Sequence, residues 1–153
     1  IIEEFSMFDD WEERYQYMID LGKTLPLIDE QYKNDDHIIK GCQSKVWLNA
    51  AMEDDKVVFT ADSDAIITKG IIAILIRAFS NQHPKDILES NTNFIDEIGL
   101  KEHLSPTRAN GLVSMIKQIK MFKNVTPVFI FHPPQIDPKK NSYFSHNSVQ
   151  FMC

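Results

Sequence analysis

The sequence predicts an α+β fold in which a small antiparallel β-sheet packs against helices. Apolar residues recur at helical spacing near the N-terminus and again after residue 64. The segment between them contains two stretches typical of strands, separated by the acidic turn Glu53-Asp54-Asp55. A helix, a hairpin and then further helices is the element order of folds in which the helices are segregated from the sheet.

The first helix is predicted from a single apolar stripe. Gly22 is expected to end this helix, and Pro26 lies just beyond it. The stripe consists of Phe8, Trp11, Tyr15, Met18 and Ile19.

Two strands are predicted over residues 37–48 and 56–61. In the first, Val46 and Leu48 alternate with residues of the opposite face. The second is rich in β-formers at Val57-Val58-Phe59. The short acidic turn makes an antiparallel hairpin the expected pairing.

Helical spacing returns after the hairpin. Asp62 or Ser63 is expected to cap a helix that runs to about Ser80, and Pro84 marks the break after it. A shorter amphipathic segment follows, and Ser105-Pro106 then supplies a cap and a first-turn proline for the last helix. The apolar residues of these two segments are Phe94, Ile95, Ile98 and Leu100, and then Leu112, Met115, Ile116, Ile119 and Phe122.

Two regions of different character divide the 153 residues. Residues 1–125 are expected to form one domain, since a chain of this length can bury one sizeable core. Residues 126–153 contain four of the seven prolines and show no helical or strand period. A peripheral, proline-rich C-terminal tail is therefore expected there.

The composition argues against several classes of function. Two cysteines, Cys42 and Cys153, are too few for a disulfide scaffold, a four-cysteine zinc site or a four-thiolate iron–sulfur cluster. A formal net charge of −6 disfavours binding to nucleic acid or an anionic membrane. The apolar run from Ile71 to Ile76 is far shorter than the about 20 residues that cross a bilayer, and no secretory signal opens the sequence. A cytoplasmic protein is expected.

Cys42 is the candidate reactive residue. The preceding Gly41 permits backbone conformations that would present the thiol at the tip of a turn. Lys40 and Lys45 are expected to lower the pKa of the thiol and so to favour the nucleophilic thiolate. The alternative is a buried cysteine that packs as a small hydrophobic residue, and the spacing alone leaves both interpretations open.

Several motifs that follow one another along the chain carry a family resemblance. They are Gly41-Cys42-Gln43-Ser44 with Val46-Trp47, Asp62-Ser63-Asp64-Ala65, Lys69-Gly70, and His103-Leu104-Ser105-Pro106-Thr107-Arg108 with Gly111-Leu112. In this order they resemble the SufE family of sulfur-acceptor proteins over about residues 5–123. The resemblance implies the SufE/IscU-like form of the α+β fold, and the tail from about Thr126 has no counterpart.

The resemblance implies a role in sulfur transfer. A SufS-type cysteine desulfurase would pass sulfur to Cys42, where it would be held as a persulfide, and this transfer would stimulate the desulfurase. The chain would then deliver the sulfur to the scaffold that assembles iron–sulfur clusters. No metal and no cofactor of its own is expected, because the pyridoxal phosphate would belong to the desulfurase. One thiol suffices for a carrier, whereas a second nearby thiol would discharge the persulfide. The thiol is expected to be poorly exposed in the free protein.

Further residues of these motifs are expected to support the acceptor or to bind the partner. Arg108 would bind an acidic group on the loop or the partner, or else form an ion pair at a helix terminus. Asp62 and Asp64 are expected to cap a helix rather than to dock a partner. The remaining candidates are Gly41, Gln43 and Ser44 beside the acceptor, Lys69 as a surface charge or partner contact, and His103 as a structural residue or proton acceptor.

Three alternatives remain open at this point. A thiol enzyme would use Cys42 as the nucleophile and His37 or His103 as the base. A metal-binding or cluster-scaffold protein would take ligands from Cys42, Asp64 and His103. A non-catalytic binding module would simply pack Cys42 in its core.

Overall fold

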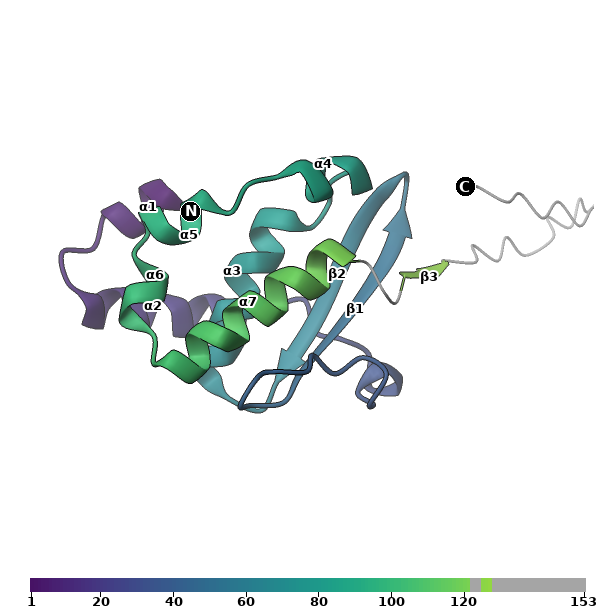
Figure 1. Cartoon of the computed structure of the whole chain (residues 1–153), viewed down its shortest axis with the longest axis horizontal. Coiled ribbons are helices and arrows are strands. Elements are labelled where there is room, and N and C mark those ends of the chain that lie inside the picture. The colour runs from purple at the N-terminus through teal and green to yellow at the C-terminus, as the bar shows by residue number, and fades with distance from the viewer. Residues whose placement is uncertain (122–124, 128–153) are drawn as a thin grey trace, which may run out of the picture.

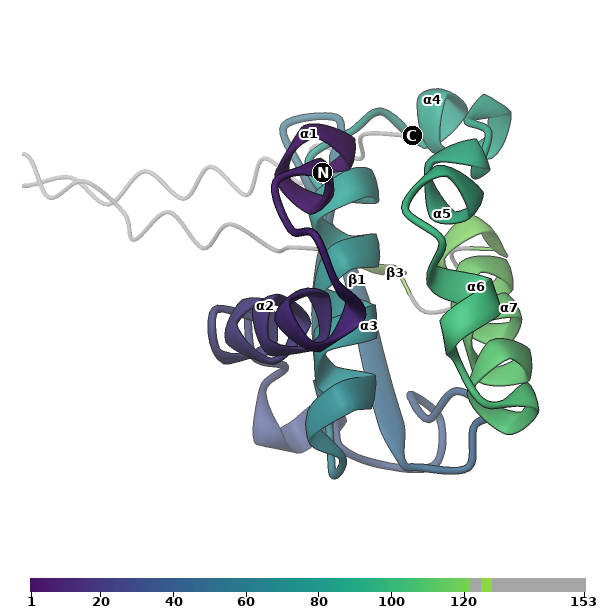
Figure 2. The ribbon, with the colours of Figure 1, turned by 90° about the vertical axis from the view of Figure 1, so that its left-hand side faces the viewer.

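The computed structural model describes residues 1–121 and 125–127, and the arrangement of their helices and strands is shown in Figures 1 and 2. The first half contains α1 (Ile2–Ser6), α2 (Trp11–Lys23), the 3₁₀ turn η1 (Glu30–Tyr32), β1 (Val46–Glu53) and β2 (Lys56–Ser63). The second half contains α3 (Ile66–Phe79), α4 (Pro84–Glu89), α5 (Asn93–Glu97), α6 (Leu100–His103), α7 (Pro106–Met121) and β3 (Val125–Pro127). The predicted α+β class is confirmed.

The sheet has the strand order β2-β1-β3. β1 and β2 form the predicted antiparallel hairpin, and their pairing runs from Val46 opposite Ser63 to Glu53 opposite Lys56. Asp54 and Asp55 connect them with positive φ angles of 45° and 65°, as a tight two-residue turn requires. β3 adds a short parallel pairing to β1, which the sequence did not suggest.

The predicted strand over residues 37–48 is wrong in its first part. β1 begins only at Val46, and the preceding residues pair back onto it: the amide of Ile39 donates to the carbonyl of Val46 at 2.8 Å, and the amide of Leu48 donates to the carbonyl of His37 at 2.9 Å. The chain therefore reverses direction within residues 40–45. Gly41, with a φ of 93°, supplies the left-handed conformation in this reversal.

α3 is the central helix of the core. Every residue from Ile71 to Ile76 is buried, so the apolar run of the sequence is a core helix. α2 and α7 lie on different sides of α3, with the sheet behind it in the view of Figure 2. No helix within the described part of the chain is long and apolar enough to cross a membrane.

Two predicted helix ends are wrong for reasons of packing and strand length. α2 continues through Lys23, and Gly22 lies inside it, where a Cβ would come 3.0 Å from the amide nitrogen of Gly70 in α3. Neither Asp62 nor Ser63 caps α3, because both belong to β2; Ala65 precedes the helix and forms no side-chain cap. Gly22 allows α2 and α3 to approach closely. Asp62 instead pairs with Lys33 and Lys69.

The later helices follow the predicted pattern more closely. α7 begins at Pro106, and Ser105 accepts a hydrogen bond from the amide of Arg108 at 3.4 Å, as expected for a cap. Gly99, with a φ of 70°, divides the shorter segment into α5 and α6. Phe122 and residues 128–153 lie outside the described residues. The tail therefore stays a prediction, although its first two residues take part in β3.

An ion pair attaches α1 to α3. The guanidinium of Arg77 contacts both carboxylate oxygens of Glu4 at 2.9 Å. The hydrogen bonds from Arg77 outweigh partial burial and lower the pKa of Glu4 from 4.5 to about 2. The pair consequently stabilises the fold above pH 4.5, and its contribution is lost as the pH falls towards 2.

Glu4→Gln should therefore destabilise the protein at neutral pH by about 1 kcal/mol or less, since both side chains are partly exposed to screening solvent. Urea unfolding of the two proteins at pH 7 and at steps between pH 4.5 and 2 measures the effect. The difference in the free energy of unfolding should shrink over that interval. A difference independent of pH would show that the charge of Glu4 is not its source.

Candidate functional site

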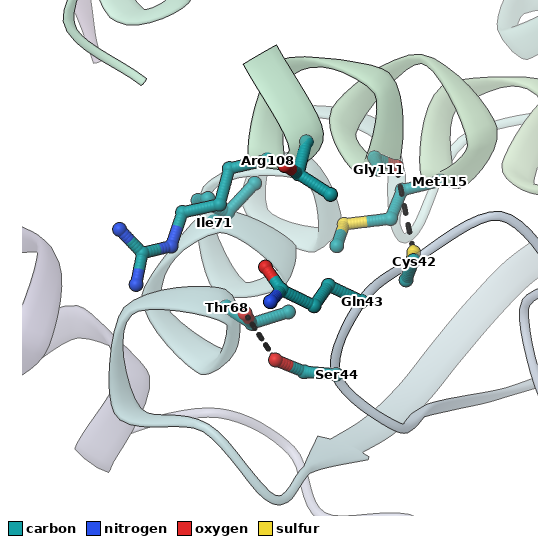
Figure 3. A pocket seen from close by; sticks show the side chains of 9 residues that line it. Cys42, Gln43, Ser44, Thr68, Ile71, Arg108, Gly111 and Met115 are labelled. Carbon is teal, nitrogen blue, oxygen red and sulfur yellow. Dashed lines mark hydrogen bonds between the residues drawn. The ribbon is translucent and has the colours of Figure 1, made fainter. Parts of the chain in front are cut away.

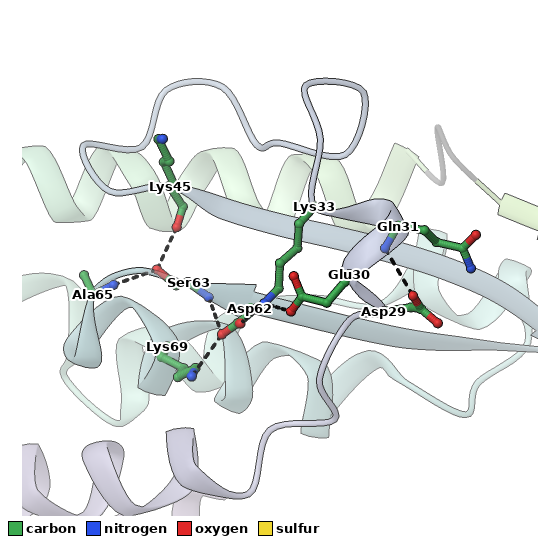
Figure 4. Close-up of polar contacts among 9 residues, drawn as sticks. All are labelled: Asp29, Glu30, Gln31, Lys33, Lys45, Asp62, Ser63, Ala65 and Lys69. Carbon is green, nitrogen blue, oxygen red and sulfur yellow. Dashed lines mark hydrogen bonds and ion pairs between the residues drawn. The ribbon is translucent and has the colours of Figure 1, made fainter.

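Cys42 lies at the tip of the reversal formed by residues 40–45, and both ends of this loop are anchored. Ile39 pairs with Val46 at its base. Lys45 is held from two sides. Its amide donates to Oδ1 of Asp64 at 3.0 Å. Its carbonyl accepts from the Ser63 hydroxyl at 2.8 Å, as Figure 4 shows. Both ends of the loop are therefore fixed, and its last residue, Lys45, is held by Ser63 of β2 and by Asp64.

The Cys42 side chain faces a small cavity between its own loop, α3 and α7 (Figure 3). The cavity offers about 10 Å³ to the centre of a water-sized sphere, which is room for about one water molecule. It is lined by Cys42, Gln43, Ser44, Thr68, Ile71, Thr107, Arg108, Gly111 and Met115.

The thiol is sheltered against α7. Sγ lies 3.6 Å from the carbonyl oxygen of Gly111, to which it donates a hydrogen bond, and a Cβ on Gly111 would come 3.4 Å from Sγ. Met115 and Ile71 line the same cavity and are buried. Cys42 is half-buried, which agrees with the expected shelter.

The prediction that Lys40 and Lys45 lower the pKa of Cys42 is wrong, because the pKa is raised. Burial raises the pKa of the Cys42 thiol, because the charged thiolate loses solvation in the cavity. Lys40 and Lys45 do not reverse this effect. In the sheltered position the thiol is therefore held in its neutral, weakly nucleophilic form at neutral pH.

Arg108 and the residues after Cys42 line the cavity as the motifs suggested. The Ser44 hydroxyl accepts from Thr68 at 3.4 Å, and Gln43 lies between Ser44 and Arg108 in Figure 3. Arg108 is exposed, and within residues 1–121 and 125–127 it forms no ion pair, so the expected helix-terminus salt bridge is not found there. A cation thus stands at the rim of the cavity that shelters Cys42.

Asp62 and Lys69 form an ion-pair network with Lys33 (Figure 4). Asp62 contacts Lys33 at 2.8 Å and Lys69 at 2.9 Å. Burial raises the pKa of Asp62, but the hydrogen bonds from the two lysines outweigh it and keep the pKa below its usual value. Lys69 is therefore a paired residue that ties α3 to β2, while Asp64 orients the stem of the loop.

The two candidate histidines do not line the cavity of Cys42. His103 stacks on Trp11 of α2 at 3.7 Å between ring centroids, and its Nδ1 lies 3.0 Å from the carbonyl oxygen of Gly99. His37 contacts the side chain of Asn34 at 2.9 Å. The thiol-enzyme alternative thus receives no base at Cys42 from either histidine.

The described ranges of the chain contain no cluster of three or more His, Cys, Asp or Glu residues that would hold a metal ion. The proposed ligand set of Cys42, Asp64 and His103 is not brought together: Asp64 bonds to the loop stem, and His103 packs on α2. The metal alternative therefore lacks its predicted ligands.

The sequence motifs included Arg108 and Gly111 of α7 but did not indicate that Thr68 of α3 and Met115 of α7 line the same cavity. Thr68 carried one signal, a polar residue in a helix that is otherwise strongly apolar. Met115 was recognised only as part of an apolar stripe, and Lys33 gave no sign that it would pair with Asp62. These contacts join segments that are distant in sequence, so no local pattern indicates them.

Comparison with known proteins identifies what the chain is similar to. The family model described as SufE, Fe-S metabolism associated domain, matches residues 1–123. An uncharacterized SufE-like protein of Rhizobium meliloti (strain 1021) is 42% identical over 125 residues, covering 78% of this chain and 89% of that protein. One from Rhizobium etli is 39% identical over 125 residues, covering 78% of this chain and 84% of its own.

The fold also has a solved counterpart. The solution structure of a hypothetical protein from Thermus thermophilus superposes with a TM-score of 0.66 at 21% identity, covering 79% of this chain and 88% of that one. At this identity the likeness concerns the fold alone, and it agrees with the α+β arrangement described above.

Proposed function

The chain belongs to the SufE family and thereby to Fe–S metabolism, and from this premise we propose that it is a persulfide carrier with Cys42 as the acceptor. It takes sulfur from a cysteine desulfurase, stimulates that enzyme by removing its product, and delivers the sulfur to the scaffold of iron–sulfur cluster assembly. It needs no cofactor for this step, since the pyridoxal phosphate belongs to the desulfurase. The carrier acts in the cytoplasm.

The observation that supports this proposal most directly is the placement of Cys42. The thiol stands at the tip of a loop with anchored ends and faces a cavity with room for about one further small group. A persulfide is destroyed by a second thiol or by solvent reductants, so a carrier benefits from shelter. Cys42 is the sole cysteine among the described residues, which keeps a discharging thiol away from it in that part of the chain.

The transfer step resembles thiol–disulfide exchange. The Cys42 thiolate attacks the outer sulfur of the donor persulfide, a new S–S bond forms at Cys42, and the donor cysteine leaves as a thiolate. No net oxidation or reduction occurs, and the proton of the Cys42 thiol passes to solvent or to the departing thiolate. Because burial raises the pKa of the thiol and lowers its thiolate fraction, attack is favoured when the side chain leaves its sheltered position.

Mass spectrometry tests the acceptor role. The protein is mixed with a cysteine desulfurase and cysteine, and the peptides that contain Cys42 and Cys153 are analysed separately without reductant. One added sulfur atom on the Cys42 peptide is the expected result. Sulfur only on Cys153, or stoichiometric zinc or iron with an unmodified Cys42, would contradict the carrier function.

Arg108 is expected to contribute to binding of the desulfurase. Its exposed guanidinium stands unpaired by acids of the described chain at the rim of the cavity, where it can meet an acidic group of the partner. Arg108→Ala should weaken the complex about three- to tenfold and flatten its dependence on ionic strength. Titration calorimetry at two salt concentrations measures both quantities.

Lys101→Ala is the matched control, because Lys101 is also an exposed cation but is paired with Asp96 at 3.1 Å and does not line the cavity. It should leave the affinity nearly unchanged. Equal losses for both variants would mean that Arg108 acts only through overall charge.

A further inference from the structure

The Cys42 loop touches α7 at two points, one helical turn apart. At the first, the thiol meets the backbone of Gly111. At the second, Gly41 meets Ser114: a Cβ on Gly41 would lie 2.7 Å from Oγ of Ser114, closer than such atoms approach in proteins. Ser114 belongs to none of the sequence motifs and does not line the cavity around the thiol.

The Ser114 side chain is itself held in place. Its hydroxyl donates to the carbonyl of Asn110 at 3.1 Å, one turn back on α7, and this directs Oγ at the surface on which Gly41 rests. The glycine has no side chain, so the loop backbone can settle directly on the serine. This contact immediately precedes Cys42 in the chain, so added bulk at the contact would move the thiol.

The strong hydrogen bonds of the loop lie at its two ends and not at its tip. The thiol of Cys42 is a weak donor to the carbonyl of Gly111, and the bond from Thr68 to Ser44 is long at 3.4 Å. Beside Ser114 a surface groove of about 490 Å³ lies between residues 35–40, which lead into the loop, and α7. It is lined by Asp35, Asp36, Ile38, Ile39, Lys40, Ser114, Lys117, Gln118 and Met121. Between its anchored ends, the tip of the loop at Gly41 and Cys42 therefore rests on its two contacts with α7.

We propose that Ser114 is a positioning residue: it seats Gly41 on α7 and thereby keeps the acceptor thiol inside its cavity. A small side chain at position 114 lets the loop lie down, and a bulkier one holds the loop and Cys42 away from the helix. The proposal rests on the proposed function only in taking Cys42 as the acceptor.

Ser114→Ile tests the seat. A β-branched residue in a helix has essentially one side-chain rotamer, so isoleucine cannot turn away from Gly41 as a longer unbranched chain would. The readout is alkylation of Cys42 by iodoacetamide between pH 6 and 10 (roughly the range around the ordinary thiol pKa). Peptide mass spectrometry separates Cys42 from Cys153.

Alkylation of Cys42 in Ser114→Ile should be faster at neutral pH, because relief of burial lowers the pKa of the thiol and so raises its thiolate fraction. Its pH profile should move to lower pH, which a purely structural role of Ser114 would not produce. Ser114→Ala and Val113→Ile should behave like the unchanged protein. Ser114→Ala keeps the side chain that faces Gly41 small, and Val113→Ile adds bulk at an exposed position on the same helix.

Ser114→Val places a smaller branched side chain at the same contact and should also accelerate alkylation, so the test survives if Ser114→Ile does not fold. An unchanged rate and pH profile in a folded Ser114→Ile protein would overturn the proposal, as would equal acceleration by Ser114→Ala. No desulfurase enters the assay. A failure of sulfur transfer to Cys42 would therefore refute the carrier function, whereas the alkylation result for Ser114 would not depend on it.

Discussion

Cys42→Ser is expected to take up no sulfur at all from a cysteine desulfurase while keeping its fold. A serine hydroxyl cannot form the S–S bond of a persulfide, so the acceptor chemistry is lost completely. The fold should survive because the side chain is only half-buried and its hydroxyl can donate to the carbonyl of Gly111, as the thiol does. The variant should still bind the desulfurase, since the loop and the rim residue Arg108 remain.

Three measurements separate these expectations: peptide mass spectrometry for sulfur uptake, calorimetry for binding, and sulfide release for turnover of the desulfurase. Cys153→Ser is the control, and it should accept sulfur at Cys42 like the unchanged protein. If Cys42→Ser still stimulated full sulfur turnover, the acceptor mechanism would have to be abandoned in favour of a purely allosteric effect on the desulfurase.

Gly70→Ala should cause a large loss of stability. α2 crosses α3 at this glycine so closely that an added Cβ would lie 2.4 Å from the carbonyl oxygen of Met18 and 2.8 Å from its carbonyl carbon. These are backbone atoms in the middle of α2, so the clash can be relieved only by moving one helix away from the other. Overpacking of this kind costs about 1–3 kcal/mol or more, although alanine is intrinsically favoured over glycine in a helix by roughly 0.5–1 kcal/mol.

Urea unfolding followed by circular dichroism measures the effect as a lower midpoint. Gly111→Ala provides the matched control for stability, because its Cβ would meet Cys42 at 3.4 Å, an ordinary contact, in another buried part of a helix. It should be neutral or slightly stabilising. If Gly70→Ala were as stable as this control, the close approach of α2 and α3 would not be the reason for a glycine at position 70.

Most helices were predictable because their pattern is local. The run from Ile71 to Ile76 indicated a buried helix, Ser105-Pro106 marked the start of α7, and the acidic turn at residues 53–55 marked the hairpin. The prediction of a helix end was wrong where the residue makes a contact with a segment distant in sequence. Gly22 looks like a helix terminator, but its missing side chain is needed for contact with Gly70 on another helix.

The strand over residues 37–48 failed for a related reason. A run of suitable residues indicates extended backbone but not where the chain turns. The reversal at residues 40–45 depends on Ile39 pairing with Val46 and on Asp64 and Ser63 holding Lys45. This reversal, and not a continuous strand, puts Cys42 at a tip.

The candidate acceptor, Cys42, could be proposed from the amino-acid order alone, because a cysteine after a glycine and a set of family motifs are properties of the linear sequence. The pKa of its thiol could not, since Lys40 and Lys45 argued for a lower value and the cavity raises it. Solvation depends on which atoms surround a group, and many of the atoms around Cys42 come from α3 and α7, which lie far along the chain from the loop. The sequence therefore determined which thiol is the candidate acceptor, whereas the cavity that shelters it and raises its pKa arises only because distant helices pack against the loop.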